Sequence, residues 1–530
     1  WWARVGRKQW PVVVAVGLLC VVVAALWLSG FKRTFYSMWD DHNGYLPLSI
    51  QLLQRGDLIH PFSIRRMHAY GGQTYLDALA LLRFDVMQLH GVDMGLALAW
   101  VALLLVGSWR YWRPRRRWLL PVALAFVLVI QHTRPNLSSL MTGVVALLGL
   151  LRTLQWLWPR HLAGPRAALL LALVVTQAAL LRVSYVPAAG LMVLLAYLSR
   201  RRVRELLMLG GVCTVLLVPW AISLWQSSGT PLFPVFKGHL TSRTNNFDLY
   251  RFGSALWDWY LLVFRSDQTI SVYAKLSLLL AAPLVLRTRP RLRPEHLAWM
   301  ACLATYLFSI ARYHHSDQGH MDRYNMPFVC VASLAVLLAV ARSRSSLSTR
   351  VALALALVAG AAQLSKSGTN LKYIQEALAF LPKRCAAGPT RAEPLYARLQ
   401  AAVPAGAPVV AMVEYPWMLD AARNKVLFLD SLGFAAPPPG IPFDDGPDAI
   451  RAYFRGLGLR YMVAVDPESA RWRSSFYGVA TWEQAIRSGQ EHIRHDVELQ
   501  LQAAHVMKKL IDTSTVLERV NDVAVLDFGE

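Results

Sequence analysis

Apolar stretches long enough to cross a bilayer recur along the first two thirds of this 530-residue chain. An α-helix needs about 20 predominantly apolar residues to span the hydrocarbon core. The clearest stretches lie at 11–30, 138–157, 206–225, 269–286, 297–312 and 326–341. Shorter or broken ones lie at 92–109, 119–131, 167–183, 185–199 and 350–364. The sequence therefore predicts a polytopic α-helical membrane protein whose multi-span domain, residues 1–364, has about 11 spans.

Lysine and arginine concentrate in this apolar part. Residues 1–364 hold 37 basic and 13 acidic residues, a balance of +24, whereas residues 365–530 hold 18 and 19, a balance of −1. The basic residues gather in short connections on one predicted face, at 4–8, 110–117, 200–204, 287–293 and 342–350. Short basic loops mark the cytoplasmic side of a membrane protein, and they argue against a nucleic-acid partner. We expect a multi-pass protein of the inner (plasma) membrane, with an uncleaved first span, a cytoplasmic N-terminus and an extracytoplasmic C-terminal domain.

The first outward loop, residues 31–91, carries two adjacent carboxylates shortly after the first span. These are Asp40 and Asp41, in the segment WDDHNGYLPL. Adjacent carboxylates at a membrane surface repel each other, which raises the pKa of one and suits it to general-base catalysis. The alternative is a solvated loop, or the N-cap of a helix over 44–54, because Asp is favoured at that position.

Two later outward loops carry cations and histidines that suit a lipid-linked phosphate. The loop at 226–268 combines basic residues with Trp and Tyr, which favour membrane interfaces. The loop at 311–328 combines His, Asp and Arg, but the spacing fits no zinc motif. We expect contacts to the donor phosphate or sugar from Lys237, Arg265, His314, His315, Arg323 and Tyr324.

In the order of these motifs the chain resembles the integral-membrane GT-C glycosyltransferases, whose relatives include protein O-mannosyltransferases, aminoarabinose transferases of lipid A and mycobacterial arabinosyltransferases. WDDHNGYLPL is similar to the family's first outer loop, which carries an Asp or Asp-Asp soon after the first span. SGTPLFP at 228–234 is similar to the Gly-x-Pro-x-(Phe/Tyr)-Pro segment of many bacterial members. DRYNMPF at 322–328 is similar to the Arg-Tyr-x-x-Pro that leads into a late span. The resemblance covers residues 1–345.

The resemblance implies transfer of a sugar from a polyprenyl-phosphate donor to a lipid, glycan or protein hydroxyl on the extracytoplasmic face, with inversion. The family's loop Asp, which acts as general base or orients the acceptor hydroxyl, corresponds to Asp40 or Asp41. Some members bind a divalent metal and others need none. No further carboxylate is clearly placed beside this pair, so we expect neither a metal nor another cofactor.

Residues 365–530 alternate short apolar runs with helical patterns, which predicts a separate extracytoplasmic α/β domain with a mainly parallel sheet. The runs lie at 408–414, 425–430, 460–465 and 523–528, with helices near 416–423, 446–457 and within 480–511. One hypothesis makes this domain an acceptor- or glycan-binding module, with Trp417, Asp430 and the Pro-rich loop 435–443 near the active cavity. The other makes it a lid or scaffold without a site of its own.

Three other functions remain open at this point. An O-antigen polymerase or ligase would depend on Arg and His of a late outer loop rather than on the early Asp pair. A transporter would need ionisable residues at mid-membrane depth and internal repeats, neither of which we find in the sequence. An inactive relative serving as a scaffold would retain its function after substitution of the Asp pair.

Overall fold

The computed structural model describes residues 38–84, 89–108, 116–130, 137–233, 235–241, 292–312, 318–342, 393–472, 477–488 and 494–529, together with residues 14, 17, 21, 86 and 112. Its contacts divide the chain into two compact units. The first, here called the helical unit, comprises Trp1–Arg33, Met87–Leu217 and Leu249–Cys385. The second, the mixed unit, comprises Thr34–Val86, Val218–Asp248 and Ala386–Glu530. The predicted domain boundary at 364/365 lies outside the described residues.

The helical unit is built from apolar helices. Its described elements are η5 (Val92–Ala97), α5 (Leu98–Ser108), α6 (Leu119–Ile130), α7 (Leu140–Leu157), η8 (Trp158–Arg160), α8 (Pro165–Leu181), η9 (Val183–Tyr185), α9 (Val186–Ser199), most of α10 (Val203–Ser228), α13 (Pro294–Arg312) and α14 (Gln318–Arg342). Of the described helices, three are long and apolar enough to cross a membrane, at Leu140–Arg160, Val203–Ser228 and Tyr324–Arg342. The count of about 11 spans stays a prediction, because the stretches at 11–30, 269–286 and 350–364 lie largely or wholly outside the described residues.

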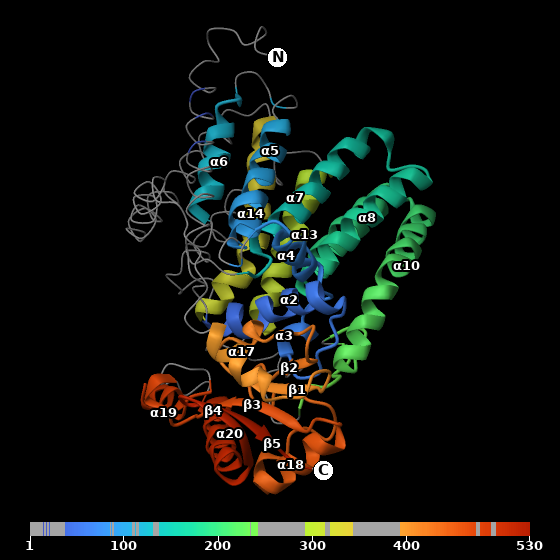
Figure 1. The fold of residues 1–530 in the computed structure, drawn as a ribbon. Coiled ribbons are helices and arrows are strands. Elements are labelled where there is room, and N and C mark those ends of the chain that lie inside the picture. Colours follow the sequence, from blue (N-terminus) through green and yellow to red (C-terminus); the bar gives the residue numbers. More distant parts are fainter. Residues whose placement is uncertain are drawn as a thin grey trace. The chain divides into compact units, whose positions relative to one another are not determined.

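Buried polar contacts fix the packing of α7, α13 and α14, which lie side by side (Figure 1). The buried carboxylate of Asp93, on η5, contacts the start of α7. It accepts hydrogen bonds from the backbone N–H groups of Met141 at 3.0 Å and Thr142 at 2.8 Å. These are N–H groups that a helix N-terminus leaves without an internal partner. The buried Glu295 carboxylate accepts from Gln155 at 2.8 Å and pairs with Arg342. The carboxylates thus stabilise the bundle by satisfying polar groups that would otherwise be buried unpaired.

The mixed unit joins the first outward loop to the C-terminal segment. The loop forms the π-helix η3 (Met38–Tyr45), α2 (Leu46–Arg55), α3 (Ile64–Met67) and α4 (Gly72–Leu81). The C-terminal segment forms α17 (Glu393–Ala401), β1 (Val409–Met412), η12 (Pro416–Met418), β2 (Val426–Phe428), η13 (Phe443–Asp445), α18 (Pro447–Gly456), β3 (Tyr461–Val465), η14 (Ala470–Trp472), α19 (Val479–Arg487), α20 (Arg494–Thr513), β4 (Thr515–Val520) and β5 (Val523–Asp527).

The C-terminal sheet is mixed rather than mainly parallel. Its strand order is β2-β1-β3-β5-β4, and β1 pairs in parallel with both β2 and β3. The β3–β5 and β5–β4 pairs are antiparallel. The prediction missed β4 because its side chains are mostly exposed and follow no clear apolar alternation. The helix expected near 416–423 is also wrong, because only the short turn η12 forms there.

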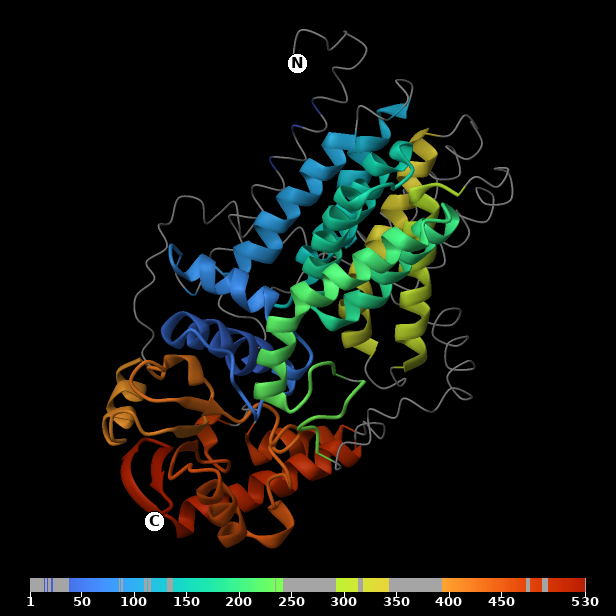
Figure 2. The same cartoon turned by 90° about the vertical axis from the view of Figure 1, so that its right-hand side faces the viewer.

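Two of the loops predicted to face outward contribute to the packing of the C-terminal segment. Leu48, Leu58 and Phe62 of the first loop belong to the same buried apolar cluster as the strands, and the loop helices lie against the strands in Figure 2. In the second loop, Leu240 pairs with Ala435 as an isolated antiparallel bridge. The C-terminal segment therefore shares one core with residues more than 300 positions earlier in the chain.

Candidate functional site

The two adjacent aspartates lie on η3 and have different environments. Asp41 is fully buried, whereas the Asp40 side chain is 14% exposed. Neither caps α2, whose N-cap is Tyr45 with no side-chain hydrogen bond, so the N-cap interpretation of the pair is wrong. Successive residues of a helix point in different directions, and here this leaves Asp40 as the carboxylate of the pair that solvent can reach.

Arg65, on α3, connects Asp40 to a carboxylate of the C-terminal segment. Its Nη2 and Nε donate to Asp40 Oδ1 at 2.9 and 3.2 Å, and its Nη1 donates to Asp430 Oδ1. Asp430 is fully buried and accepts two further hydrogen bonds at Oδ2, from Ser63 Oγ at 2.8 Å and from the Arg65 backbone N–H at 3.2 Å. One guanidinium thus lies between two carboxylates that are 390 positions apart in sequence.

A glycine makes room for this arginine. A Cβ at position 44 would lie 2.7 Å from Nε of Arg65 and closer still to its Cδ. Carbon and nitrogen atoms do not approach that closely without displacement. Gly44, in the WDDHNGY motif, is therefore required by the close approach of the Arg65 stem to the η3 backbone.

The residues after the Asp pair also contact the C-terminal segment. Trp417 Nε1 donates to His42 Nδ1 at 2.9 Å, and the Tyr415 ring meets the imidazole edge-on with centroids 4.8 Å apart. Burial lowers the pKa of His42 to about 4, so the ring is neutral at physiological pH. Because Nδ1 accepts a hydrogen bond, the proton of this neutral ring sits on Nε2.

Arg65 is not among the site residues predicted from the sequence. A signal was available, because Arg65 and Arg66 are adjacent cations in a loop predicted to face outward, where the positive-inside rule makes basic residues less frequent. Arg66 has a structural role. It is buried and donates to the carbonyl oxygens of Leu58 and Ala69 and to Ser223 Oγ, and burial lowers its pKa to about 10.

The residues predicted to bind the donor divide between the two units. Lys237 is exposed in the second loop of the mixed unit. Tyr324 lies at the start of the apolar part of α14 in the helical unit, where the Arg182 guanidinium stacks 4.1 Å from its ring centroid. Arg323 lies in the same helix, but its side chain is outside the described residues, as are Arg265, His314 and His315. Their roles stay predictions.

The SGTPLFP motif makes a tight turn within the mixed unit. Gly229 has a positive φ of 65°, and a Cβ there would lie 2.7 Å from the His239 ring. Tyr70 donates from its hydroxyl to the Pro231 carbonyl at 3.1 Å, and the backbone N–H of His239 donates to the Ser228 carbonyl at 2.8 Å. The motif thus fixes the second outward loop against the first.

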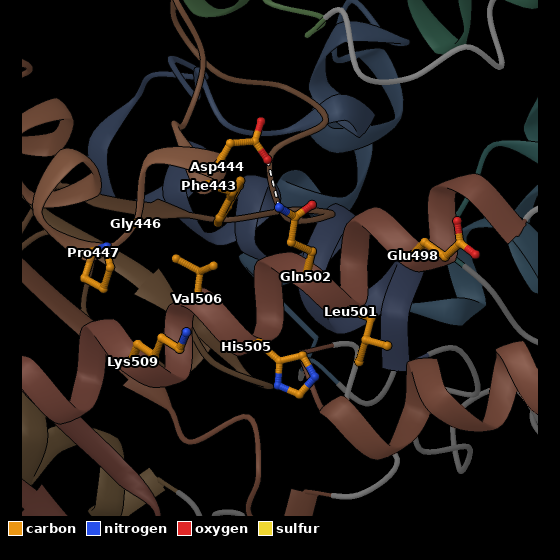
Figure 3. Close-up of a pocket in the computed structure, with 10 residues that line it drawn as sticks. All are labelled: Phe443, Asp444, Gly446, Pro447, Glu498, Leu501, Gln502, His505, Val506 and Lys509. Carbon is orange, nitrogen blue, oxygen red and sulfur yellow. Dashed lines mark hydrogen bonds between the residues drawn. The ribbon is translucent and has the colours of Figure 1, made fainter.

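A separate cavity of about 530 Å³ lies between the start of α18 and the middle of α20 (Figure 3). Its polar lining is exposed, and Gln502 Nε2 donates to Asp444 Oδ1 at 2.8 Å. The residues drawn there include none of those predicted from the sequence. Among the described residues, no group of three or more His, Cys, Asp or Glu side chains could hold a metal ion.

Comparison with known proteins identifies the fold. No family model and no curated protein sequence matches the chain. The crystal structure of ArnT from Cupriavidus metallidurans in the apo state is similar, with a TM-score of 0.51, 15% sequence identity and coverage of 99% of both chains. Two structures of the oligosaccharyltransferase AglB from Archaeoglobus fulgidus match at TM-scores of 0.41 and 0.42 and 13% identity, over 87% and 94% of this chain and 70% and 72% of theirs.

The likeness to ArnT extends over essentially the whole of both chains. At 15% identity it concerns the fold and not the chemistry. Together with the apolar helices, it confirms the prediction of a helical membrane protein with a C-terminal α/β segment. The fold expected from the sequence motifs thus agrees with the likeness to ArnT.

Proposed function

We propose that this protein is a membrane glycosyltransferase that moves a sugar from a polyprenyl-phosphate donor to a hydroxyl of a lipid, glycan or protein acceptor. The reaction takes place on the extracytoplasmic face of the inner membrane and inverts the anomeric centre. The ArnT fold over 99% of both chains supports the general class of enzyme. The motifs of the outward loops support the lipid-linked donor.

Asp40 is the general base of this reaction. The acceptor hydroxyl transfers its proton to the Asp40 carboxylate as its oxygen attacks the anomeric carbon, and the bond to the donor phosphate breaks with its electron pair going to the phosphate. The observation that carries this assignment is the contrast between the two aspartates, because a base must reach its substrate. The Asp40 side chain is 14% exposed and held by Arg65, whereas Asp41 is fully buried.

The leaving phosphate develops negative charge, which fixed hydrogen-bond donors and cations stabilise. We assign this role to the predicted set, Lys237, Arg265, His314, His315, Arg323 and Tyr324. The exposure of Lys237 is compatible with contact to a lipid headgroup. The reaction needs no metal or other cofactor.

The test uses purified protein in nanodiscs with a panel of radiolabelled polyprenyl-phosphate sugars and a membrane extract as acceptor source. We compare wild type with Asp40→Asn and Asp41→Asn. The matched control is Asp448→Asn, which removes an arginine-paired carboxylate that is 94% exposed. We expect transfer from one donor by wild type and by the control, and a loss of at least about 100-fold in Asp40→Asn, the usual contribution of a general base.

Full transfer by both Asp40→Asn and Asp41→Asn would contradict the assignment. The same panel then tests His314→Ala and Arg323→Ala, because dependence on these late-loop residues is what a polymerase or ligase predicts. No transfer from any donor by wild type would contradict the glycosyltransferase itself and favour a transporter or scaffold.

A further inference from the structure

We propose that Asp430 is a positioning residue of the C-terminal segment, which holds the Asp40 carboxylate in place through Arg65. The inference rests on the proposed role of Asp40 as the base. It goes beyond that role by giving the C-terminal segment a specific part in the reaction. Asp430 makes no contact with substrate in this account, because its side chain is fully buried.

The geometry of Arg65 is the first observation. Nε and Nη2 bind one oxygen of Asp40, at 3.2 and 2.9 Å, while Nη1 binds Asp430. A guanidinium presents its N–H groups in a rigid planar fork, so fixing one side of the fork fixes the other. Asp430 therefore determines where the donors to Asp40 lie.

The fixation of Asp430 is the second observation. Asp430 lies two residues after the end of β2, and its Oδ2 accepts from Ser63 Oγ and from the Arg65 backbone N–H. The backbone N–H of Asp430 also donates to the Phe62 carbonyl at 3.3 Å. A carboxylate with this many fixed donors is an anchor for the arginine.

The energetic cost of the arrangement is the third observation. Burying a carboxylate carries a large desolvation penalty, so a buried ion pair is weak support for a purely stabilising role. An apolar residue following β2 would fill the same space without that cost. Precise placement of a partly exposed carboxylate is a function that an apolar residue could not perform.

A second contact fixes the same loop from the other side of the Asp pair. Trp417 donates to His42, two residues beyond Asp40. Both Trp417 and Asp430 belong to the C-terminal segment, so η3 is held by that segment at two points. This favours the hypothesis that places Trp417 and Asp430 near the active cavity over that of a lid without a role in the site.

The arrangement has an electrostatic consequence for Asp40. Arg65 shares its positive charge between two carboxylates, so it favours the ionised form of Asp40 less than it would if Asp40 were its only partner. Besides Arg65 and Asp430, the titratable groups around this cluster are Asp41 and His42 on the same helix as Asp40, and Tyr477, whose charge interacts with those of Glu414 and Arg65.

The experiment measures kcat, KM for the donor, and the pH dependence of kcat/KM. It compares wild type with Asp430→Asn, Arg65→Lys and Asp448→Asn. Asn at 430 keeps an oxygen for Ser63 and for the Arg65 backbone, so the fold is retained. The whole charge of Arg65 then falls to Asp40. We expect the acid limb of the profile to move about one unit to lower pH, kcat to fall about 10-fold because the base is weaker and less well placed, and KM to stay within twofold.

Arg65→Lys keeps the charge but cannot bridge both carboxylates, and it tests the proposal independently if Asp430→Asn folds poorly. We expect a similar fall in kcat. The control should match wild type. A wild-type kcat and acid limb in both Asp430→Asn and Arg65→Lys, with Asp40→Asn still inactive, would overturn the positioning role and leave the proposed function intact. Full activity in Asp40→Asn would instead overturn the proposed function.

Discussion

Asp40 and Asp41 are chemically identical neighbours, and their environments separate their roles. The sequence predicts that the pair matters, but it does not say which carboxylate is accessible. That difference arises from the π-helical turn of η3 and from Arg65, which is 25 positions further along the chain. Local sequence patterns carry no information about such a contact, so this part of the site required the structure.

Gly44→Ala tests the placement of Arg65. The added methyl would collide with the aliphatic stem of Arg65. Asp40 and Asp430 bind the guanidinium of this arginine, so moving the stem must break at least one of these two contacts. We expect kcat to fall by 10-fold or more with little change in the melting temperature. Gly456→Ala, where a Cβ meets nothing within 4 Å, is the control. Wild-type transfer by Gly44→Ala would contradict the close approach.

Two buried histidines make stability depend on pH. Burial lowers the pKa of His42 to about 4 and that of His60 to about 3. In the unfolded chain both titrate near 6.5, so the unfolded state binds more protons as the pH falls below that value. Stability is therefore full above pH 6.5 and decreases toward pH 4, by about 1.4 kcal/mol per pH unit for each histidine.

The measurement is the thermal unfolding midpoint in detergent at pH 7.5 and at pH 5. We expect wild type to lose more stability between these values than His42→Gln, which keeps an acceptor for Trp417 but cannot take up a proton. His505→Gln, at an exposed position on α20, should behave like wild type. Equal losses in wild type and His42→Gln would contradict the burial of a neutral His42.

At the scale of elements, α4 presents an apolar face to its surroundings. Tyr75 and Leu79 are 48% and 46% exposed and the C-cap residue Leu82 is 61% exposed, whereas Asp77 and Ala78 are 1% and 6% exposed. An exposed apolar face on a helix of a membrane protein indicates contact with the lipid interface. We expect α4 to lie along the outer surface of the bilayer.

Fluorescence quenching checks the position of α4. A fluorophore on Leu79→Cys in nanodiscs should be quenched by lipids brominated near the headgroup. The same fluorophore on Leu457→Cys, 39% exposed at the end of α18, should not be quenched. Equal quenching at the two positions would rule out a specific interfacial role for α4.

The secondary structure of the C-terminal segment could be predicted well where burial follows a simple pattern. The runs at 408–414, 425–430, 460–465 and 523–528 contain β1, β2, β3 and β5. These strands are buried almost throughout, so they appear as continuous apolar runs. The exposed strand β4 and its antiparallel pairing have no such pattern, which explains why the sheet was predicted to be mainly parallel.

At the scale of the whole molecule, segments far apart in sequence share one core. Residues 34–86 and 218–248 group with 386–530 in the mixed unit. The motifs of the first 345 residues led to the correct fold, because they mark loops between spans. The contacts that Asp430 makes with Arg65 and Trp417 makes with His42 could not be predicted from the sequence. Residues more than 300 positions apart that contact each other leave no periodic pattern in the sequence.

Metal independence is a prediction about the complete enzyme. Arginine, lysine and histidine supply the positive charge in our account, so transfer should continue in EDTA at the rate seen with added Mg²⁺ or Mn²⁺. The measurement is the initial rate of transfer after dialysis against chelator. A loss of activity that Mn²⁺ restores would show that a metal, and not the fixed cations alone, stabilises the leaving phosphate.

The central claim is that the carboxylate of Asp40 accepts the proton of the acceptor hydroxyl. Its most direct test is the kcat of Asp40→Ala with and without sodium formate, at constant ionic strength, beside wild type and Asp448→Ala. We predict a fall of at least about 100-fold in Asp40→Ala, partial recovery when formate supplies a carboxylate in the vacated space, and no effect of formate on the other two proteins. A kcat for Asp40→Ala within twofold of wild type would contradict the claim.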